Sequence, residues 1–370
     1  MRRCDVLIVG GGPAGSSCAG KLLDAGVDVL LIDKKPFPRD KTCAGWVTPP
    51  VLKSLGFDAD DYRNGRVFQP ITGFRTGIIS GEEVVSRYDE VVSYGIRRFE
   101  FDHYLLARTR VECLLGEPVK AIEKNGTGWI VNGSIRASLI VGAGGHFCPV
   151  ARMMGNRKNR VESVVTAQEI EFEPPLDLLD TGSVEAETPE FFFCDDLKGY
   201  GWCVRKDNFL NIGLGRVDAD ALSSHVAAFC GFLKEQGKVR CEIPARFHGH
   251  AYELYEQSEP KLVDDGVLLV GDSAGLAYPQ SGEGIRPAVE SGLIAGDVIC
   301  SAKGDYSRAR LEEYRLQLTH RLGRPRKHRA GNWLPAGWLR FAATRLLATR
   351  WFSKRVVLNR WFLHADEAAL

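Results

Sequence analysis

A glycine-rich turn at residues 10–15, Gly-Gly-Gly-Pro-Ala-Gly, is the feature that most constrains this 370-residue chain. The apolar run before it, residues 5–9, is typical of a strand buried on both faces of a parallel sheet. Residues 13–25 predict a helix, and residues 27–32 predict a second buried strand that ends at Asp33. Glycines at the first, third and sixth positions permit a tight turn and the close approach of a pyrophosphate to the helix N-terminus. The opening residues therefore predict a βαβ unit that binds a dinucleotide.

An acidic residue at the end of the second strand strengthens this interpretation. A carboxylate at that position accepts hydrogen bonds from a ribose in dinucleotide-binding units. The alternative is a glycine-rich turn without a ligand, but here the whole strand, turn, helix, strand and acid context is present. The candidate cofactor contacts in this unit are Gly10, Gly12, Ala14, Gly15, Asp33 and Lys34.

A second pair of signals, more than two hundred residues downstream, favours FAD over NAD. Residues 267–270 predict a short buried strand that runs into Gly271-Asp272, where a carboxylate can hold the ribityl chain of a flavin. Residues 279–285 then open a helix whose free amides suit the electron-rich edge of a reduced flavin. A helix N-cap is the alternative role for Asp272. The candidate contacts here are Asp272, Gly282, Gly284 and Ile285.

Composition and charge exclude several other classes. A formal net charge of +1 does not fit a globally basic nucleic-acid binder. Ten cysteines occur without a C-x-x-C pair or a close Cys/His cluster, so we expect no metal site. The apolar run after Met1 is too short for a signal peptide, so we expect a cytoplasmic protein. Without export, Asn125-Gly126-Thr127 is interpreted as a tight turn rather than a glycosylation site.

The pattern of elements predicts an α/β protein with a Rossmann-type FAD-binding domain that is discontinuous in sequence. We expect that domain to comprise residues 1–160 and 262–305, with a substrate-domain segment near 46–97. Residues 161–261 change to longer mixed strands and predict an inserted, mainly antiparallel substrate domain. Residues 306–370 predict a helical C-terminal segment.

Six motifs in this order give the chain a family resemblance. They are GGGPAGS at 10–16, FPRDKTCAG at 37–45, RRFEFD at 97–102, GYGW at 199–202, NIGLG at 211–215 and GDSAGLAYPQSGEGI at 271–285. Over roughly residues 4–300 the chain resembles the geranylgeranyl reductase family, within the flavoprotein class typified by p-hydroxybenzoate hydroxylase. The resemblance implies an FAD-dependent oxidoreductase.

The resemblance also implies roles for particular residues. Arg98 should approach the FAD phosphates or adenine, and Cys43 and Ala44 should lie beside the flavin; Arg39 belongs to the same cofactor motif as Cys43. Cys43, Tyr200 and Trp202 are the candidate catalytic residues. The alternatives are a surface ion pair for Arg98, a small buried hydrophobe for Cys43, and core packing for Tyr200 and Trp202.

Two departures from the pattern affect this inference. The wider hydroxylase class carries an Asp-Gly pair where this chain has Gly-Ala-Gly-Gly-His at residues 142–146, which weakens the case for a transient nicotinamide contact. NAD(P)H stays a candidate electron donor. The family commonly follows its Y-x-W with Phe-Pro, whereas Cys203 and Val204 stand here, so substrate-pocket residues are expected to differ.

The segment 320–364 contains eleven Lys and Arg residues and no acidic residue, interleaved with Trp and Phe. This pattern favours an interfacial helix on anionic lipid, which would make the protein peripheral at the cytoplasmic membrane face. The alternative is a helix packed on its own protein with its basic residues in water. No nucleic-acid partner is expected, because no stacking platform accompanies the basic residues.

Three functions remain to be compared. The leading hypothesis is reduction of carbon–carbon double bonds in an isoprenoid or other hydrophobic substrate by hydride from reduced flavin. A flavin monooxygenase is the alternative; a halogenase is disfavoured because no lysine occurs between Ser54 and Val119. A membrane-docked electron-transfer flavoprotein is the third. The oligomeric state is left open.

Overall fold

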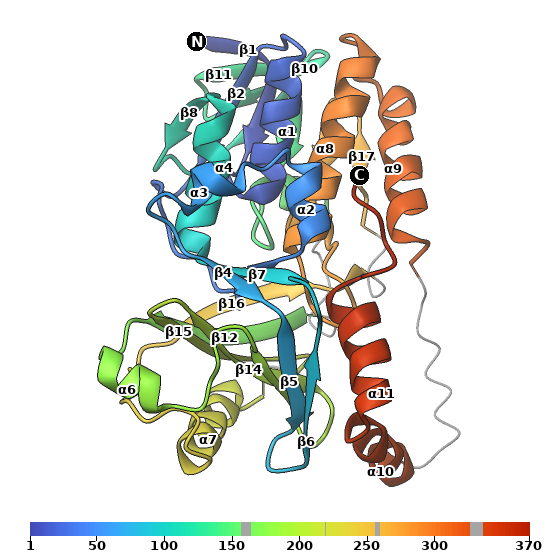
Figure 1. Ribbon diagram of the computed structural model, residues 1–370. Coiled ribbons are helices and arrows are strands. Elements are labelled where there is room, and N and C mark those ends of the chain that lie inside the picture. Colours follow the sequence, from blue (N-terminus) through green and yellow to red (C-terminus); the bar gives the residue numbers. More distant parts are fainter. Residues whose placement is uncertain (157–163, 219, 256–259, 326–335) are drawn as a thin grey trace.

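The computed structural model describes residues 1–156, 164–218, 220–255, 260–325 and 336–370. Two lobes are stacked one above the other, and a small sheet lies between them (Figure 1). That small sheet pairs β3 (Trp46–Val47), β7 (Ser93–Ile96) and β4 (Phe68–Ile71). Parts of the expected segment near 46–97 thus lie at the junction between the two lobes, while its residues 73–87 join the lower sheet.

The upper lobe is built on a mainly parallel sheet with the order β17-β18-β11-β1-β2-β8. Its central strand β1 (Arg2–Val9) runs parallel to β2 (Val29–Asp33) and β11 (Ile135–Gly142). Residues 6–9 are almost fully buried, as a strand covered on both faces requires. The other strands are β8 (Glu112–Leu115), β9 (Ile122–Asn125), β10 (Gly128–Val131), β17 (Val263–Asp264) and β18 (Val267–Leu269).

Helices α1 (Pro13–Asp24) and α8 (Ile285–Ala302) pack against each other beside this sheet (Figure 1). Small residues make their approach close: a Cβ added to Gly292 would lie 2.3 Å from the Ala14 carbonyl oxygen. Helix α4 (Arg98–Thr109) packs on α1, and α9 (Arg308–Leu322) packs on α8. The short helices are α2 (Pro49–Ser54), α3 (Ala59–Arg63) and α5 (Pro149–Met153).

The lower lobe is a seven-stranded sheet with the order β16-β12-β15-β14-β13-β5-β6. All its strand pairs are antiparallel except β13 with β5. Helix α7 (Leu222–Glu235) packs on β12 and β15, and α6 (Leu176–Thr181) lies nearby. The strands are β5 (Gly73–Ile78), β6 (Glu83–Arg87), β12 (Val164–Phe172), β13 (Glu190–Phe193), β14 (Gly199–Lys206), β15 (Phe209–Arg216) and β16 (His248–Glu253).

The C-terminal segment packs on the edge of the lower sheet formed by β5 and β6 (Figure 1). Helix α10 (Ala336–Leu347) is followed by α11 (Arg350–Phe352), which continues as the π-helix Ser353–Phe362. Val357, Leu358 and Phe362 are fully buried in one cluster with the aromatic residues of the lower lobe. Part of this segment therefore belongs to the hydrophobic core. Among the described residues, no helix combines the length and apolarity needed to cross a membrane.

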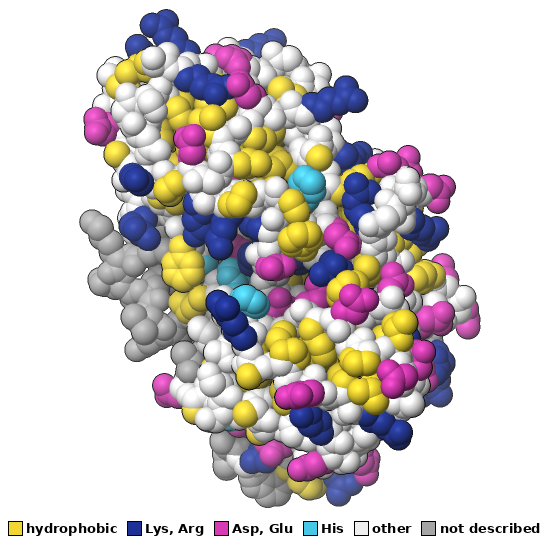
Figure 2. Space-filling view, turned by 90° about the vertical axis from the view of Figure 1, so that its left-hand side faces the viewer, with side chains coloured by type: hydrophobic (Ala, Val, Ile, Leu, Met, Phe, Trp, Pro, Cys, Tyr) yellow, Lys and Arg dark blue, Asp and Glu magenta, His cyan; other side chains and the backbone are white. Residues whose placement is uncertain are grey.

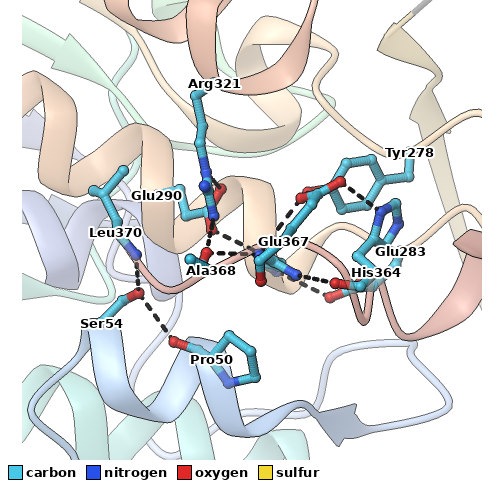
Figure 3. Close-up of polar contacts among 11 residues, drawn as sticks. Pro50, Ser54, Tyr278, Glu283, Glu290, Arg321, His364, Glu367, Ala368 and Leu370 are labelled. Atoms are coloured by element: carbon cyan, nitrogen blue, oxygen red, sulfur yellow. Dashed lines mark hydrogen bonds and ion pairs between the residues drawn. The ribbon is translucent and has the colours of Figure 1, made fainter. Parts of the chain in front are cut away.

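The end of the chain is tied to α8 by a buried cation. The Arg286 side chain is fully buried; its Nε bonds Glu290 Oε1 at 3.0 Å, and its Nη2 donates to the carbonyl oxygens of Glu367 and Ala368 at 3.1 Å. Arg321 Nε also donates to Glu290 Oε2 at 2.9 Å. Figure 3 shows the tail lying across α8, with Glu290, Arg321 and Ala368 gathered together.

The α/β fold with a Rossmann-type sheet, an antiparallel second sheet and a helical C-terminus is confirmed. The helix predicted for residues 13–25 ends at Asp24, and the helix that follows the second glycine turn begins at Ile285, with Pro287 tolerated in its first turn.

Replacing Arg286 by Ala is expected to destabilise the protein by about 3 kcal/mol. Glu290 would lose the buried one of its two cations, and removal of a partner from a buried ion pair commonly costs about 3–5 kcal/mol. Because Glu290 keeps its contact with Arg321, we expect a loss of stability at the lower end of this range. Urea unfolding measures the change, with Arg315→Ala as control, since Arg315 pairs with Glu312 on an exposed helix face. The control should lose less than about 1 kcal/mol. Equal losses in both variants would contradict this role.

Candidate functional site

The glycine turn is held by contacts that leave no room for a side chain. Gly10 has φ of +116°, and a Cβ there would lie 2.4 Å from the Ala143 carbonyl oxygen. A Cβ on Gly15 would lie 1.9 Å from the Gly10 carbonyl oxygen. The N-terminus of α1, which begins at Pro13, is thereby brought against the carboxyl end of β1. Its first amides have no acceptor within the helix, as suits a pyrophosphate.

Asp33 closes the second strand of this unit and is nearly buried. Its Oδ2 accepts a hydrogen bond from the Gly11 amide at 2.8 Å, and its Oδ1 accepts one from the Lys35 amide at 2.9 Å. These bonds fix the carboxylate at the wall of the cavity, and each oxygen keeps a further lone pair for a ribose hydroxyl.

A cavity of about 430 Å³ extends from the glycine turn to the lower sheet. Figure 2 shows the hollowed band between the lobes, where basic, acidic and histidine side chains gather. All but one of the sequence-predicted site residues line it: Gly10, Gly12, Ala14, Asp33, Lys34, Arg39, Cys43, Ala44, Arg98, Tyr200, Trp202, Asp272, Gly282, Gly284 and Ile285. The exception is Gly15, which lies behind the turn and shapes it.

The second turn, between β18 and α8, approaches the same cavity. Gly282 has φ of +68°, and a Cβ there would lie 2.3 Å from the Tyr252 hydroxyl. A Cβ on Gly284 would lie 3.1 Å from Asp272 Oδ1, so the carboxylate lies beside the N-terminus of α8. Burial raises the pKa of Glu283, the residue between these glycines, to about 7.

Asp272 is not a helix N-cap; it is the anion of a small charged cluster. Its Oδ2 lies 3.4 Å from His250 Nε2 and 3.9 Å from Lys41 Nζ. Lys41 Nζ and His250 Nε2 are 2.6 Å apart. Burial lowers the pKa of Lys41 to about 8. Burial alone would raise the pKa of Asp272, but the bond from His250 and the Lys41 charge hold it well below its usual range.

Arg98 forms an ion pair that is buried rather than at the surface. Its Nε and Nη2 donate to the two oxygens of Asp102 at 2.7 Å each, and Arg39 Nη1 lies 3.2 Å from the same carboxylate. Burial disfavours the charge, but Asp102 outweighs it and raises the pKa of Arg98. Two guanidinium groups therefore share one carboxylate at the cavity wall, which leaves a net positive charge suited to phosphate.

The loop that carries Cys43 is held by the lower sheet. The Cys43 amide donates to Glu169 Oε2 at 3.0 Å, and its carbonyl accepts from Asn211 Nδ2 at 3.2 Å. Trp202 Nε1 donates to Asn211 Oδ1 at 2.7 Å. Tyr200 donates its hydroxyl proton to the Ser281 carbonyl at 2.5 Å. Tyr200 and Trp202 thus both line the cavity and pack in the core.

Comparison with known proteins agrees with this geometry. Residues 3–56 match the model of a family described as FAD binding domain. The chain is 28% identical over 347 residues to a digeranylgeranylglycerophospholipid reductase of Methanothermobacter thermautotrophicus, covering 86% of this chain and 83% of the relative. A solved Thermoplasma acidophilum structure described as geranylgeranyl bacteriochlorophyll reductase-like has a TM-score of 0.76 at 22% identity, covering 94% of this chain and 88% of that one.

Over most of its length the chain is similar to geranylgeranyl-type reductases, and it is an FAD-dependent oxidoreductase. A flavin-dependent brominase shares the fold of this oxidoreductase, with a TM-score of 0.71 and 19% identity over 98% of this chain and 92% of that one. That likeness concerns the fold alone.

The residues of the oxidoreductase fit FAD. The α1 turn, the Arg39 and Arg98 pair, and the α8 turn with Asp272 offer in succession an amide cradle, a cationic wall and a carboxylate for hydroxyl groups. Two helix N-termini direct their positive ends toward one cavity. Among the described residues, no cluster of three or more metal-ligating side chains occurs.

Sequence reasoning missed several polar residues of this oxidoreductase. Lys41 lies within the matched FPRDKTCAG motif, so its position was available as a signal. Glu169 occupies an inward position on β12, where Val165, Ala167 and Glu169 alternate; an acid in that alternation is the signal that could have identified it. His250 comes from β16, which nothing in the sequence connects to the glycine turns.

Gly15→Ala is expected to weaken FAD binding by roughly tenfold or more, which is about 1.4 kcal/mol. The added Cβ forces the turn away from the helix N-terminus. Gly20→Ala on the same helix is the matched control, because its Cβ would meet only Thr109 Cγ2 at 3.7 Å. The control should keep its flavin and gain up to about 1 kcal/mol in stability. Titration of apoprotein with FAD measures both variants; equal affinities would contradict the assignment.

Proposed function

We propose that this oxidoreductase reduces carbon–carbon double bonds of an isoprenoid lipid. The observation that carries the proposal is that one cavity joins the two glycine turns to an aromatic wall and to Cys43. Trp46, Tyr200 and Trp202 form that wall, which suits an apolar chain. The relatives named digeranylgeranylglycerophospholipid reductase support the choice of substrate class.

FAD, when bound and reduced, supplies the hydride. The chain's own residues would bind the lipid, exclude water and deliver the proton that the second carbon needs. We assign the proton to Cys43, whose thiol is half-buried at the cavity wall. Tyr200 and Trp202 are assigned to shaping the wall, because their polar hydrogens are already donated to Ser281 and Asn211.

The cofactor contacts of the individual residues belong to the same proposal. The α1 turn with Asp33 and Lys34 would hold the pyrophosphate and the adenine-side ribose, with Arg39 and Arg98 beside the phosphates. Asp272 and the turn Gly282–Ile285 would hold the ribityl chain and the ring, with Cys43 and Ala44 beside it. NAD(P)H is retained as the candidate electron donor, to be tested by bleaching of the oxidised flavin with each nucleotide under argon.

A geranylgeranyl lipid is expected to reoxidise the dithionite-reduced protein under argon, as read from the return of flavin absorbance. A lipid with the same headgroup and fully saturated chains is the control and should leave the flavin reduced. A monooxygenase is the alternative on this fold; it would form product only when oxygen is admitted. Failure of every polyprenyl substrate to reoxidise the flavin would contradict the reductase assignment.

We also propose that the exposed part of the C-terminal segment contacts the cytoplasmic face of a membrane. Phe341, Leu346 and Trp351 are exposed by 59%, 45% and 68% respectively. Arg340, Arg345, Arg350 and Arg355 are exposed on the same segment. Aromatic side chains beside arginines suit the boundary between anionic headgroups and acyl chains. The buried residues of the π-helix would keep this surface attached to the lower lobe.

The double variant Phe341→Ser/Trp351→Ser is expected to bind anionic liposomes at least roughly tenfold more weakly, because apolar burial in the interface is lost. Both side chains are exposed, so the fold should be preserved. Leu316→Ser on α9 removes an equally exposed apolar residue from another surface and is the control. Co-sedimentation measures binding; a double variant that matches the control would remove this surface from consideration. Deleting the whole segment would be uninformative, because Phe362 belongs to the core.

A further inference from the structure

A buried carboxyl group lies directly behind the Cys43 loop. Glu169 is 6% exposed on β12, and its Oε2 accepts both the Cys43 amide at 3.0 Å and Asn211 Nδ2 at 2.9 Å. Asn211 Nδ2 also donates to the Cys43 carbonyl. Both sides of residue 43 are therefore fixed by one carboxyl and one amide of the lower sheet. The amide is itself oriented by Trp202, which lines the large cavity.

A second, small cavity of about 60 Å³ separates this carboxyl from solvent. Glu169, Asn211 and Cys43 line it, together with Lys41 and the exposed His248. It has room for more than one water molecule, since a buried water needs on the order of 10–15 Å³. Lys41, Cys43 and Arg98 also line the large cavity. The Cys43 loop thus lies between the large cavity, which would hold the lipid, and the small polar cavity, which reaches the surface.

Charged and titratable groups from several elements surround Glu169. On its own strand, Glu171 is paired with Lys206 of β14 at 2.7 Å and with Arg97 at 3.2 Å. On the neighbouring strand β16, His248 stands opposite Glu169 in the register. The remaining charged groups that line the small cavity are Asp40, Lys41 and Arg98.

These surroundings shift the pKa values of two carboxyls on the same strand, Glu169 and Glu171, in opposite directions. Burial raises the pKa of Glu169 to about 7, because its hydrogen bonds from Cys43 and Asn211 and the charge of Lys206 offset the burial only in part. Burial also acts on Glu171, but Lys206 and Arg97 outweigh it and lower the pKa of that carboxyl. At neutral pH one carboxyl can therefore hold a proton while its neighbour is ionised.

We propose that Glu169 is a positioning and proton-relay residue, which feeds a proton through the small cavity to Cys43. The inference rests on the proposed function. In the reduction, one alkene carbon receives hydride from the reduced cofactor, which is oxidised by two electrons. The other carbon takes the thiol proton of Cys43, so a C–H bond forms as the S–H bond breaks. The Glu169 proton moves through water to the sulfur, and the resulting carboxylate regains a proton from solvent on the His248 side.

Glu169→Gln is the decisive variant, because the amide keeps the size and an acceptor oxygen but cannot titrate. In the wild type, the rate of reoxidation by lipid under argon should fall as pH rises above about 7, where the carboxyl loses its proton. In the variant the limiting rate should fall by roughly 10²-fold and this alkaline decline should disappear. The lipid concentration for half-maximal rate should stay unchanged. A purely structural role would instead change that concentration and the flavin spectrum.

Two further variants serve as controls. Glu171→Gln changes the neighbouring carboxyl on the same small cavity and should retain the alkaline decline, because that group holds no proton at neutral pH. Glu169→Asp keeps a titratable group and should restore the decline with part of the rate. Infrared difference spectra of the FAD-loaded protein give an independent readout. Glu169 and Glu283 should each give a protonated carboxyl band that titrates near pH 7, and Glu169→Gln should lose one of these two bands.

The relay is overturned if Glu169→Gln reoxidises at the wild-type rate with the same alkaline decline, or if this variant loses no carboxyl band that titrates near neutral pH. Failure of the proposed function gives a different result: the wild type itself would then not be reoxidised by lipid under argon, and the relay would fall with it.

Discussion

The close packing of α1 against both the β1 turn and α8 is the constraint on which the rest of the structure depends. Gly15 touches the Gly10 carbonyl, and Gly292 touches the Ala14 carbonyl, at distances that exclude a Cβ at either position. These contacts bring two turns that are far apart in sequence to one cavity. Each turn ends at a helix N-terminus, so the cavity receives two positive helix ends along with its side-chain charges. The discontinuity of the cofactor lobe follows from this meeting of distant segments.

Several of the charged groups at the cavity have an oppositely charged partner beside them. Arg39 and Arg98 share Asp102, and Asp272 is matched by Lys41 and His250. Buried charges require such partners, since an isolated one would cost several kcal/mol. The opposite side of the cavity is lined by aromatic rings, and the polar hydrogens of Tyr200 and Trp202 are donated to protein acceptors. A phosphate-bearing cofactor and an apolar chain therefore suit opposite ends of the same cavity.

Sequence alone predicted the parts of the fold whose signals are local. The βαβ unit and the second turn could be located because glycine spacing and apolar runs act over a few residues. Glu169 and His250 could not be connected to the site, because their positions depend on β12 and β16 pairing far from the glycine turns. The C-terminal segment showed the limit of composition: the same basic and aromatic pattern covers exposed Trp351 and fully buried Phe362. Which face is buried is decided by packing on β5 and β6, which periodicity does not encode.

The proposed function requires that this flavin site add hydrogen, rather than oxygen, to a double bond. The most direct test is the mass of the lipid product after the reduced protein reacts with a polyprenyl lipid with and without oxygen. We expect a product that has gained two hydrogen atoms per reduced double bond and that forms equally well under argon. A product that has gained an oxygen atom, formed only when oxygen is present, would contradict it.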